Sequence, residues 1–362
     1  MASENDRGAV RRGSGRVADA TGRSRPVTMR DIARATNLSQ STVSRVLNRT
    51  PTIVPIAEET RQRVMATAMA LGYRPNPLAR ALRGANTMLL GLIVRDITDP
   101  FFAGAIEAVT SAAASRGYNV VLGHAHARAD EAITLWGVLE ARHCDAILLL
   151  GDTRDQPRLL QDLAGAHVPV VALWQGTQSP GVPSVRVAND AGIRSILDHL
   201  IELGHRRIAF LGGSRLGDIK EREDTFVKHL ARLREPLREG YVQHGANEPA
   251  TSVAALERLL ALPEPPTAVV ASTDVLAVGL LHAAYERGVR VPDQLSITGF
   301  DDIPVAEFTV PPLTTVRMPV REIVEQAVRM ALDDPEHARE VPPPVLEPAL
   351  VVRASTGPVA PR

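Results

Sequence analysis

The sequence predicts a small all-helical N-terminal unit, followed by an α/β core of two doubly wound parallel-sheet lobes. Two observations carry this prediction. Residues 27–48 hold two capped helical patterns with a tight turn between them. From Thr87 onward, short apolar runs alternate with stretches of helical periodicity, which is typical of βαβ units. The 362 residues are enough for two or three domains of about 100–200 residues each.

Charge is divided unevenly along the chain. Residues 1–83 hold 15 Lys and Arg against 6 Asp and Glu, and the remaining residues hold 26 against 35. A basic N-terminal part on an acidic body is typical of a nucleic-acid-binding module joined to a separate domain. Arg-rich tails are also often only solvated, but here basic residues continue into the expected helices.

Cysteine usage and hydropathy narrow the class of protein further. The single cysteine, Cys144, excludes a disulfide framework within one chain and fits a reducing cytoplasm. No apolar run approaches the about 18 residues of a membrane span. The first residues lack the apolar segment of a secretion signal. We therefore expect a cytoplasmic protein with no membrane partner.

The first helix is expected to follow a disordered arm. Residues 1–26 are rich in Gly, Ser, Arg and Asp and lack apolar periodicity. Thr28 with Asp31 three residues later has capping-box spacing, so a helix is expected to begin there. Asn37 marks the following turn, because Asn tolerates a left-handed backbone. Ser39 is placed to cap a second helix.

The second helix has an apolar face, with Val43, Val46 and Leu47, and a polar face. The polar face carries side chains that hydrogen-bond to base edges and phosphates: Gln40, Ser41, Thr42, Ser44, Arg45 and Asn48. This layout is typical of a helix-turn-helix whose second helix reads DNA. An ordinary helical hairpin with a solvated face fits the same capping and periodicity.

A third helix should close this small domain over residues 27–73. Glu58 and Glu59 suit its first turn, and Gly72 suits its end. Residues 74–86 are expected to form a linker containing a short helix, with Asn76 as its cap. Such a short helix is unstable alone in water, so a plain linker remains an alternative.

Seven near-continuous apolar runs predict strands that are buried on both faces of parallel sheets: 88–94, 118–123, 146–151, 168–173, 207–213, 267–272 and 295–300. One sheet has room for all seven. A charge-rich break near 213–224 favours two lobes instead. In such a fold, a ligand binds in the crevice at the carboxyl ends of the strands.

Signals for an enzyme are weak. The segment GGSRLG at 212–217 does not match the spacing of a dinucleotide fingerprint, and no P-loop or GxSxG elbow occurs. The histidines show no metal-binding spacing. Asp301 and Asp302 are a candidate acid–base pair, which keeps an enzyme as an alternative. We expect no cofactor and no metal.

Several stretches closely resemble the lactose-repressor (LacI/GalR) family of bacterial regulators. They are VTMRDIARATNLSQSTVSRVLN, GLIVRDITDPFFAGAIEAV, HLIELGHRRIAFLGG, RVPDQLSITGFDDIPVAEFTVPPLTTVRMPV and LVVRAST. The resemblance covers nearly all of residues 27–356. It implies a helix-turn-helix headpiece, a hinge helix, and a periplasmic-binding-protein-like core over 87–356. Asn37 stands where the family usually has glycine.

The resemblance also implies how the core divides. One lobe would hold residues 87–185 and 317–343, and the other 187–315 and 345–356, with crossings near 186, 316 and 344. Residues 357–362 would form a tail.

For DNA, the resemblance implies that bases are read by Gln40, Ser41 and Arg45. Phosphates would be held by Thr28, Thr42, Ser44, Asn48 and Asn76. In the hinge helix, Leu82 would be the wedge inserted in the minor groove, with Ala79 beside it and Arg83 reaching the groove or the phosphates.

For a small-molecule effector, the resemblance implies a site formed by Asp96, Phe101, Trp174, Asn189, Arg222, Thr273 and Asp301. Asp96 and Asp301 would accept hydroxyl protons, Phe101 and Trp174 would stack on a ring face, and Arg222 would grip hydroxyls or a carboxylate. Many members have Asp where Trp174 stands, and Asp where Ala188 stands. The ligand is therefore expected to differ from a simple hexose.

These features predict a transcriptional regulator that represses by binding a palindromic DNA operator as a homodimer. Its effector, a sugar or related metabolite, would bind between the lobes. The tail lacks a leucine heptad, which favours a dimer over a tetramer. An alternative is a cytosolic small-molecule sensor without gene control.

Overall fold

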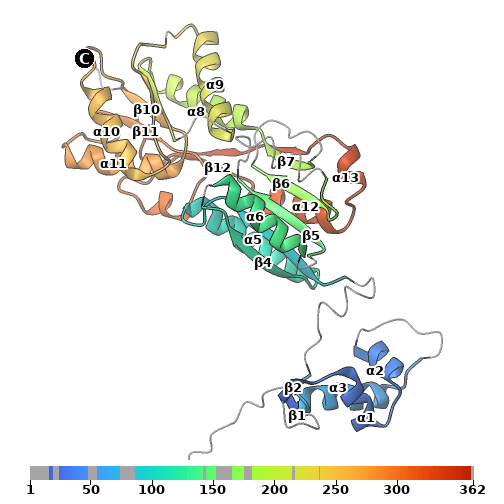
Figure 1. The fold of residues 1–362 in the computed structure, drawn as a ribbon. Coiled ribbons are helices and arrows are strands. Elements are labelled where there is room, and N and C mark those ends of the chain that lie inside the picture. The colour runs from blue at the N-terminus through green and yellow to red at the C-terminus, as the bar shows by residue number, and fades with distance from the viewer. Residues whose placement is uncertain are drawn as a thin grey trace, which may run out of the picture. The chain divides into compact units, whose positions relative to one another are not determined.

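The computed structural model describes residues 16–18, 24–47, 55–73, 86–126, 128–141, 144–151, 165–174, 182–213, 217–235 and 237–359. The chain divides into two compact units, Met1–Arg80 and Ala81–Arg362. Figure 1 shows a small helical unit and a larger α/β unit.

The smaller unit is a three-helix domain made of α1 (Met29–Thr36), α2 (Gln40–Leu47) and α3 (Glu58–Ala70). Of the apolar face predicted for the second helix, Val43 and Val46 are buried, and Leu47 packs beside them while partly exposed. The other buried residues of this core are Ile32, Ala33, Val64 and Ala68. The third helix begins at Glu58, as expected, and Gly72 follows its end with φ of 65°. The three-helix prediction is therefore confirmed.

Within the expected disordered arm, two short strands pair in antiparallel fashion, β1 (Arg16–Ala18) and β2 (Ser24–Pro26). The sequence did not predict this pairing, because neither segment has the alternating or continuous apolar pattern of a strand.

The first lobe of the larger unit is built on a six-stranded, wholly parallel sheet in the order β13-β7-β6-β5-β3-β4. Its strands are β3 (Leu89–Val94), β4 (Asn119–His124), β5 (Ala146–Leu150), β6 (Val170–Leu173), β7 (Ser184–Val187) and β13 (Val345–Leu346).

Helices cover both faces of this sheet (Figure 1). Helices α5 (Pro100–Ser115) and α12 (Val320–Leu332) pack on one face, and α6 (Ala129–Ala141) packs on the other. A short helix, α13 (His337–Glu340), follows α12. Because β3 and β5 are buried on both faces, their sequences are continuously apolar, as predicted.

The second lobe has a four-stranded parallel sheet in the order β11-β10-β8-β9. Its elements are β8 (Ile208–Gly212), β9 (Val242–His244), β10 (Ala268–Ala271), β11 (Ser296–Thr298), α8 (Asn189–Glu202), α9 (Gly217–Arg232), α10 (Pro249–Leu260) and α11 (Asp274–Glu286). The two sheets confirm the two-lobe prediction. The charge-rich segment near 213–224 lies largely inside α9, so its charged residues belong to a helix of the second lobe and not to a break between the lobes.

Three crossings join the lobes. The first follows β7, the second follows β12 (Thr315–Arg317), and the third lies between β13 and β14 (Ala349–Val351). β12 and β14 form an antiparallel pair, and a 3₁₀ segment (Pro304–Phe308) precedes them. Because β13 pairs with β7, the third crossing comes after Leu346, slightly later than expected.

The chain after β14 packs on the second lobe rather than forming a tail from residue 357. The carbonyl of Gly357 accepts a bond from His205 Nε2 at 3.0 Å, and the N–H of Val359 donates to the carbonyl of Leu203 at 3.1 Å.

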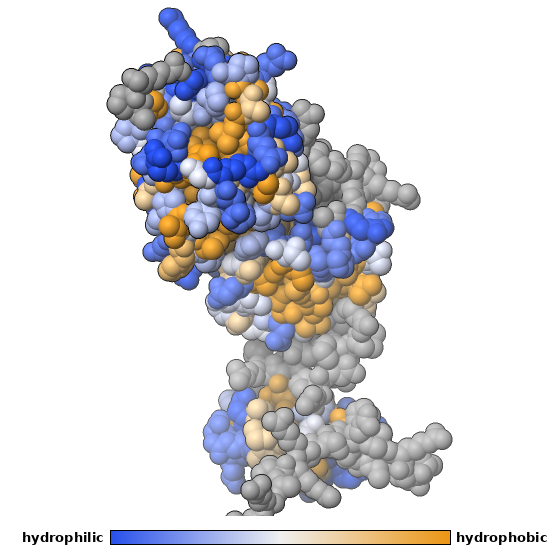
Figure 2. Space-filling view, turned by 90° about the vertical axis from the view of Figure 1, so that its left-hand side faces the viewer, coloured by the Kyte–Doolittle hydropathy of each residue, from blue (hydrophilic) through white to orange (hydrophobic). Residues whose placement is uncertain are grey.

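Figure 2 shows apolar patches interspersed with charged side chains on one face of the larger unit. Large apolar side chains that are exposed in this unit include Leu122, Tyr285, Phe308 and Val310. None of the described helices is long and apolar enough to cross a membrane.

Candidate functional site

α1 begins at the predicted capping box. The backbone N–H of Thr28 donates to Asp31 Oδ2 at 2.9 Å, and the Thr28 hydroxyl donates to the same oxygen at 2.8 Å. The Asp31 carboxylate also complements the positive end of the helix dipole. The point at which the chain enters the helix pair is therefore set by these two side chains.

The turn between α1 and α2 has the predicted left-handed residue. Asn37 has φ of 54° and ψ of 41°. The following N–H, that of Leu38, donates to the carbonyl of Ala33 at 3.0 Å. Asn is among the few residues besides glycine that adopt this conformation readily, so the turn forms without glycine.

Ser39 caps α2 by accepting the N–H of Thr42 at 3.1 Å. The hydroxyls of Ser41 and Thr42 each lie 2.8 Å from the Ser39 hydroxyl, so both also belong to the cap.

The two faces of α2 differ as the sequence predicted. Val43 and Val46 are buried in the three-helix core. Gln40 and Arg45 are exposed, and Ser44 is half-buried. Helix α2 therefore packs in the three-helix core with one face and exposes a polar face to solvent. The remaining predicted DNA contacts lie outside the described residues: Asn48, Asn76, Ala79, Leu82 and Arg83.

In the larger unit, a cavity of about 60 Å³ lies between the two lobes, where strands of both sheets end. Its lining includes five of the predicted effector residues: Phe101, Trp174, Arg222, Thr273 and Asp301. This volume is far below the roughly 300–1,000 Å³ of a typical ligand pocket, so the lobes leave little room for a ligand in this structure.

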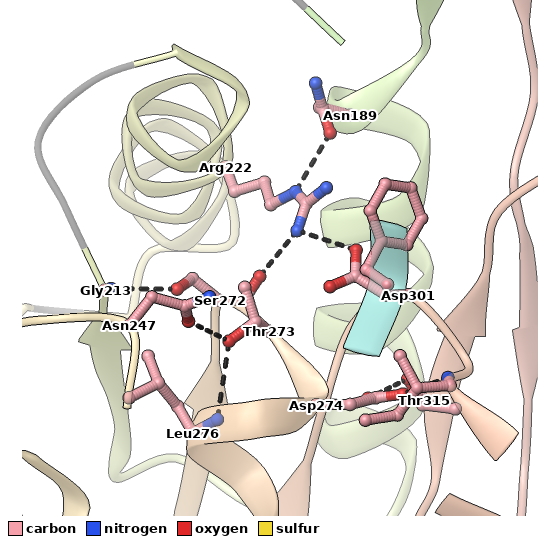
Figure 3. A network of polar contacts seen from close by, with 12 residues as sticks. Asn189, Gly213, Arg222, Asn247, Ser272, Thr273, Asp274, Leu276, Asp301 and Thr315 are labelled. Atoms are coloured by element: carbon pink, nitrogen blue, oxygen red, sulfur yellow. Dashed lines mark hydrogen bonds and ion pairs between the residues drawn. The ribbon is translucent and has the colours of Figure 1, made fainter. Parts of the chain in front are cut away.

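Arg222, on α9, is the centre of the polar network on the second lobe (Figure 3). Its Nε donates to Asn189 Oδ1 at 3.0 Å, and its Nη1 donates to the Ser272 carbonyl at 2.6 Å and to Asp301 Oδ1 at 3.3 Å. The guanidinium carbon lies 3.7 Å from the centre of the Phe300 ring. These contacts hold the charged end of a buried side chain in one place.

Asp301 faces the cavity from the loop after β11, with φ of 114°. Burial raises the pKa of Asp301 well above its ordinary value, and the charge of Arg222 only partly opposes this. A buried carboxyl group of this kind is suited to bonding ligand hydroxyls.

The first lobe contributes an aromatic wall. The rings of Phe101 and Trp174 meet edge-to-face with centres 5.0 Å apart, and Phe102 lies 6.3 Å from Trp174. Trp174 is buried and has φ of 58°, a conformation that costs of order 1–3 kcal/mol in a non-glycine residue. Among the described residues, none accepts a hydrogen bond from Trp174 Nε1.

Thr273 caps α11 by accepting the N–H of Leu276 at 3.4 Å. Its hydroxyl donates to Asn247 Oδ1 at 2.7 Å, and Asn247 Nδ2 donates across the cleft to Asp99 Oδ2 at 3.0 Å (Figure 3 shows the Thr273–Asn247 bond). Burial raises the pKa of Asp99.

Two predicted effector residues lie beside the cavity rather than in its described lining. Asp96 Oδ1 accepts bonds from the N–H and hydroxyl of Thr98, and Asp96 lines a neighbouring cavity of about 370 Å³. Asn189 bonds Arg222 and, through Nδ2, Glu221 at 3.1 Å. Asn189 therefore positions the arginine in this structure.

The sequence reasoning missed several residues that line the cavity: Arg95, Asp99, Gly151, Asp218, Ile219 and Asn247. For Asp99 a signal existed, because it lies in the loop after the first strand and directly precedes Pro100, at the N-cap position of the next helix. For Asn247 the signal was weak, because β9 is short and half-polar and was not predicted. No group of three or more metal-ligand side chains is gathered within the described part of the chain.

Comparison with known proteins agrees with both parts of the chain. A family model described as "Bacterial regulatory proteins, lacI family" matches residues 28–76, and one for a "Periplasmic binding protein-like domain" matches residues 197–356.

Two relatives span nearly the whole chain. Catabolite control protein A of Priestia megaterium is 31% identical over 306 residues, which is 84% of this chain and 91% of the relative. The HTH-type transcriptional repressor PurR of Escherichia coli (strain SMS-3-5 / SECEC) is 31% identical over 339 residues, or 91% and 96% of the two chains.

Solved structures agree as well. A lac repressor dimer bound to operator and the anti-inducer ONPF matches with a TM-score of 0.82 at 26% identity, covering 92% of this chain and 100% of that one. The complex of the transcriptional regulator CelR with cellobiose matches with a TM-score of 0.66 at 30% identity, covering 91% and 100%.

A capped helix pair with an outward polar face, attached to a two-lobed core with a polar cleft, defines a DNA-binding regulator with its own ligand-binding core. The chain belongs to the lacI family of bacterial regulatory proteins.

Proposed function

We propose that this chain is a transcriptional repressor that binds a palindromic operator as a homodimer and responds to a small molecule held between the core lobes. The observation that carries the proposal is the exposed polar face of α2. Capping and core packing hold this helix in place, and the same chain also has a cleft between two lobes. We propose a bacterial cytoplasmic protein, located on the nucleoid when bound to DNA, with no enzymatic activity.

On DNA, α2 would lie in the major groove with Gln40, Ser41 and Arg45 toward base edges. Arg45 is exposed and its guanidinium can bond two acceptors of a guanine. Ser41 has its hydroxyl at the Ser39 cap, so it would need to turn or to share that hydroxyl with a base. Thr28, Thr42, Ser44, Asn48 and Asn76 would hold the phosphates.

In the linker, two hinge helices would pair at the operator centre. Leu82 would insert between base pairs, with Ala79 beside it and Arg83 toward the groove. Unstacking a base step costs about a few kcal/mol, which the wider contact with bent DNA offsets.

In the cleft, the chemistry favours a ligand with hydroxyl groups and a flat apolar face. Asp301 and Arg222 supply an acceptor and a charged donor, and Phe101 with Trp174 supplies an aromatic wall. A sugar or a related metabolite meets these demands, with Asp96, Asn189 and Thr273 as further contacts after the lobes open. The solved complex of the similar regulator CelR with cellobiose supports this class of ligand.

The two sites would be coupled through the lobes. A ligand that changes the angle between the lobes would change whether two hinge helices can pair. The coupling is reciprocal, so an effector that weakens DNA binding must bind less tightly to the DNA-bound state.

The dimer is supported by exposed apolar side chains on the larger unit, such as Phe308 and Val310, which are 78% and 92% exposed. Apolar patches of this kind often mark contact surfaces. A measured mass of a tetramer at micromolar concentration would contradict the dimer.

The test is selection of purified protein on a pool of random DNA duplexes, followed by sequencing of the retained fraction. We expect a palindrome of two half-sites. Arg45→Ala should relax the preference at one base position of each half-site and cost about 1–3 kcal/mol. Arg63→Ala, an exposed change on α3, is the matched control and should leave that base preference intact.

A retained pool without a consensus, whose affinity follows salt alone, would contradict the proposal. That result would favour a small-molecule sensor without gene control.

A further inference from the structure

One hydrogen bond crosses the mouth of the cleft. Asp99 lies in the first lobe, where its carboxylate caps α5 by accepting the N–H of Phe101 at 3.0 Å. Asn247 lies in the second lobe, between β9 and α10. The 3.0 Å bond from Asn247 Nδ2 to Asp99 Oδ2 therefore joins the two lobes directly.

Each partner of this bond is held on its own lobe. Asp99 has its other oxygen at the helix cap, and Arg95 Nη2 lies 3.9 Å from Oδ2. Asn247 Oδ1 accepts the Thr273 hydroxyl at 2.7 Å. A Cβ on Gly213 would lie only 2.9 Å from that same Asn247 oxygen, so the neighbouring backbone leaves little room for Asn247 to move. Each side chain is thus bonded to its own lobe as well as to its partner.

The bond also stands between two cavities. Arg95, Asp99 and Asn247 line both cavities. One has about 60 Å³ and is lined by Arg222, and we call it the inner cavity; the other has about 370 Å³, and we call it the outer cavity. The inner cavity is far smaller than the roughly 300–1,000 Å³ of a typical ligand pocket. A ring-sized ligand can therefore contact Arg222 only after the lobes have moved apart, and that movement breaks the bond between Asp99 and Asn247.

A second contact between the lobes lies elsewhere. Arg186, on β7, pairs with Glu221, on α9, at 3.4 Å. Because β7 leads directly into the first crossing, this pair lies near the pivot of any opening motion. It can persist while the cleft mouth opens, so it does not duplicate the contact at the mouth.

We propose that Asp99 and Asn247 are the latch of the cleft: their bond holds the lobes closed when no effector is bound, and it must break before an effector can enter. The latch determines the fraction of ligand-free protein whose lobes are open. Because the effector enters only the open form, its apparent affinity is proportional to that fraction.

The latch can be tested without a ligand. The chain has two tryptophans, and Trp174 lines the inner cavity and is only 4% exposed. A full-length Trp136→Phe background makes Trp174 the only indole reporter. Quenching of its fluorescence by acrylamide then measures how often the cleft is open.

Asn247→Asp in this background places two carboxylates face to face and removes the donor. Loss of one hydrogen bond should raise the open-to-closed ratio roughly three- to tenfold, with a matching rise in the quenching constant. Adding Asp99→Asn to Asn247→Asp restores the hydrogen bond with its direction reversed, because the amide at position 99 now donates to the carboxylate at position 247. The quenching constant should then return to the background value. Asn247→Ser, too short to reach Asp99, should behave like Asn247→Asp.

Glu248→Gln is the matched control, since Glu248 lines the outer cavity without forming the latch, and it should change nothing. Far-UV circular dichroism establishes that each variant is folded. The proposal is overturned if Asn247→Asp and Asn247→Ser, when folded, quench like the background, or if the double variant quenches like Asn247→Asp. Operator selection is measured separately, so failure of the latch leaves the proposed repressor function standing.

Discussion

The carboxyl group of Asp274 should make the stability of the second lobe depend on pH. Asp274 begins α11 and is fully buried. Its Oδ1 accepts the Thr315 hydroxyl at 2.5 Å, and its Oδ2 accepts the N–H of Ile303 at 2.8 Å. Burial raises the pKa of Asp274 from 3.8 to about 7, although these two bonds oppose the shift.

The sign follows from proton binding. Between pH 4 and pH 7 the folded state holds a proton on this group and the unfolded state does not, so stability falls as pH rises through that window. A shift from 3.8 to about 7, at about 1.4 kcal/mol per unit, corresponds to about 4 kcal/mol of lost unfolding free energy by pH 8.

Asp274→Asn keeps the shape but cannot ionise. Its amide oxygen can accept the N–H of Ile303, and its amide nitrogen can donate to the Thr315 hydroxyl, which then acts as the acceptor. Urea unfolding of both proteins from pH 4 to pH 8 should show the wild type losing stability relative to the variant, with most of the difference appearing below pH 7. Asp293→Asn, which changes an exposed carboxylate 3.4 Å from Arg290, is the control and should track the wild type. If wild type and Asp274→Asn keep a constant difference over this range, the burial argument is wrong.

Three further predictions concern other parts of the chain. Gly279→Ala should destabilise the core by about 1–3 kcal/mol, because the added Cβ would lie 2.7 Å from the Pro249 carbonyl oxygen. Gly104→Ala is the control, since its Cβ meets nothing within 4 Å, and thermal unfolding should show no loss of stability for it. Burial lowers the pKa of His205 below 6.5, so the folded state favours the neutral ring. The stability that this ring contributes is present above pH 6.5 and is lost as pH falls. His205→Gln should remove this loss, measured as the melting temperature at a series of acidic pH values. Leu82→Ala should reduce operator bending, measured by gel mobility of permuted sites, while leaving the melting temperature of the core unchanged.

Much of the helical domain could be predicted from sequence because local rules decide it. The Thr28–Asp31 box, the left-handed Asn37 and the Ser39 cap involve residues within three positions of their partners. The apolar face of α2 follows from periodicity alone. The long buried strands were predicted for a similar reason, because burial on both faces demands a continuous apolar run.

The strands β7, β9, β12, β13 and β14 were not predicted. They have two to four residues each, and several are half-exposed, so their composition carries little signal. Long-range pairing defines them: β13 exists as a strand because β7 lies beside it.

In the candidate site, too, the sequence predicted some features and only long-range contacts decided the others. Arg222 and Asp301 were assigned by resemblance, and the structure brings them within 3.3 Å of each other, although 79 positions separate them. Asp96 and Asn189 were assigned in the same way but lie beside the cavity and bond neighbouring side chains in this closed form. The sequence offered no means of telling these cases apart.

By itself, the sequence determined the capped helix pair and the buried strands of an α/β core, because capping, periodicity and continuous apolarity are local properties. The class of regulator followed from the resemblance of several stretches to a known family. Only the tertiary structure decided that Asp99 and Asn247 meet across the cleft, that Trp174 closes its wall, and that Asp274 is buried enough to hold a proton. Those properties depend on distances and solvent exclusion between segments far apart in the chain, which come into existence only when the lobes pack.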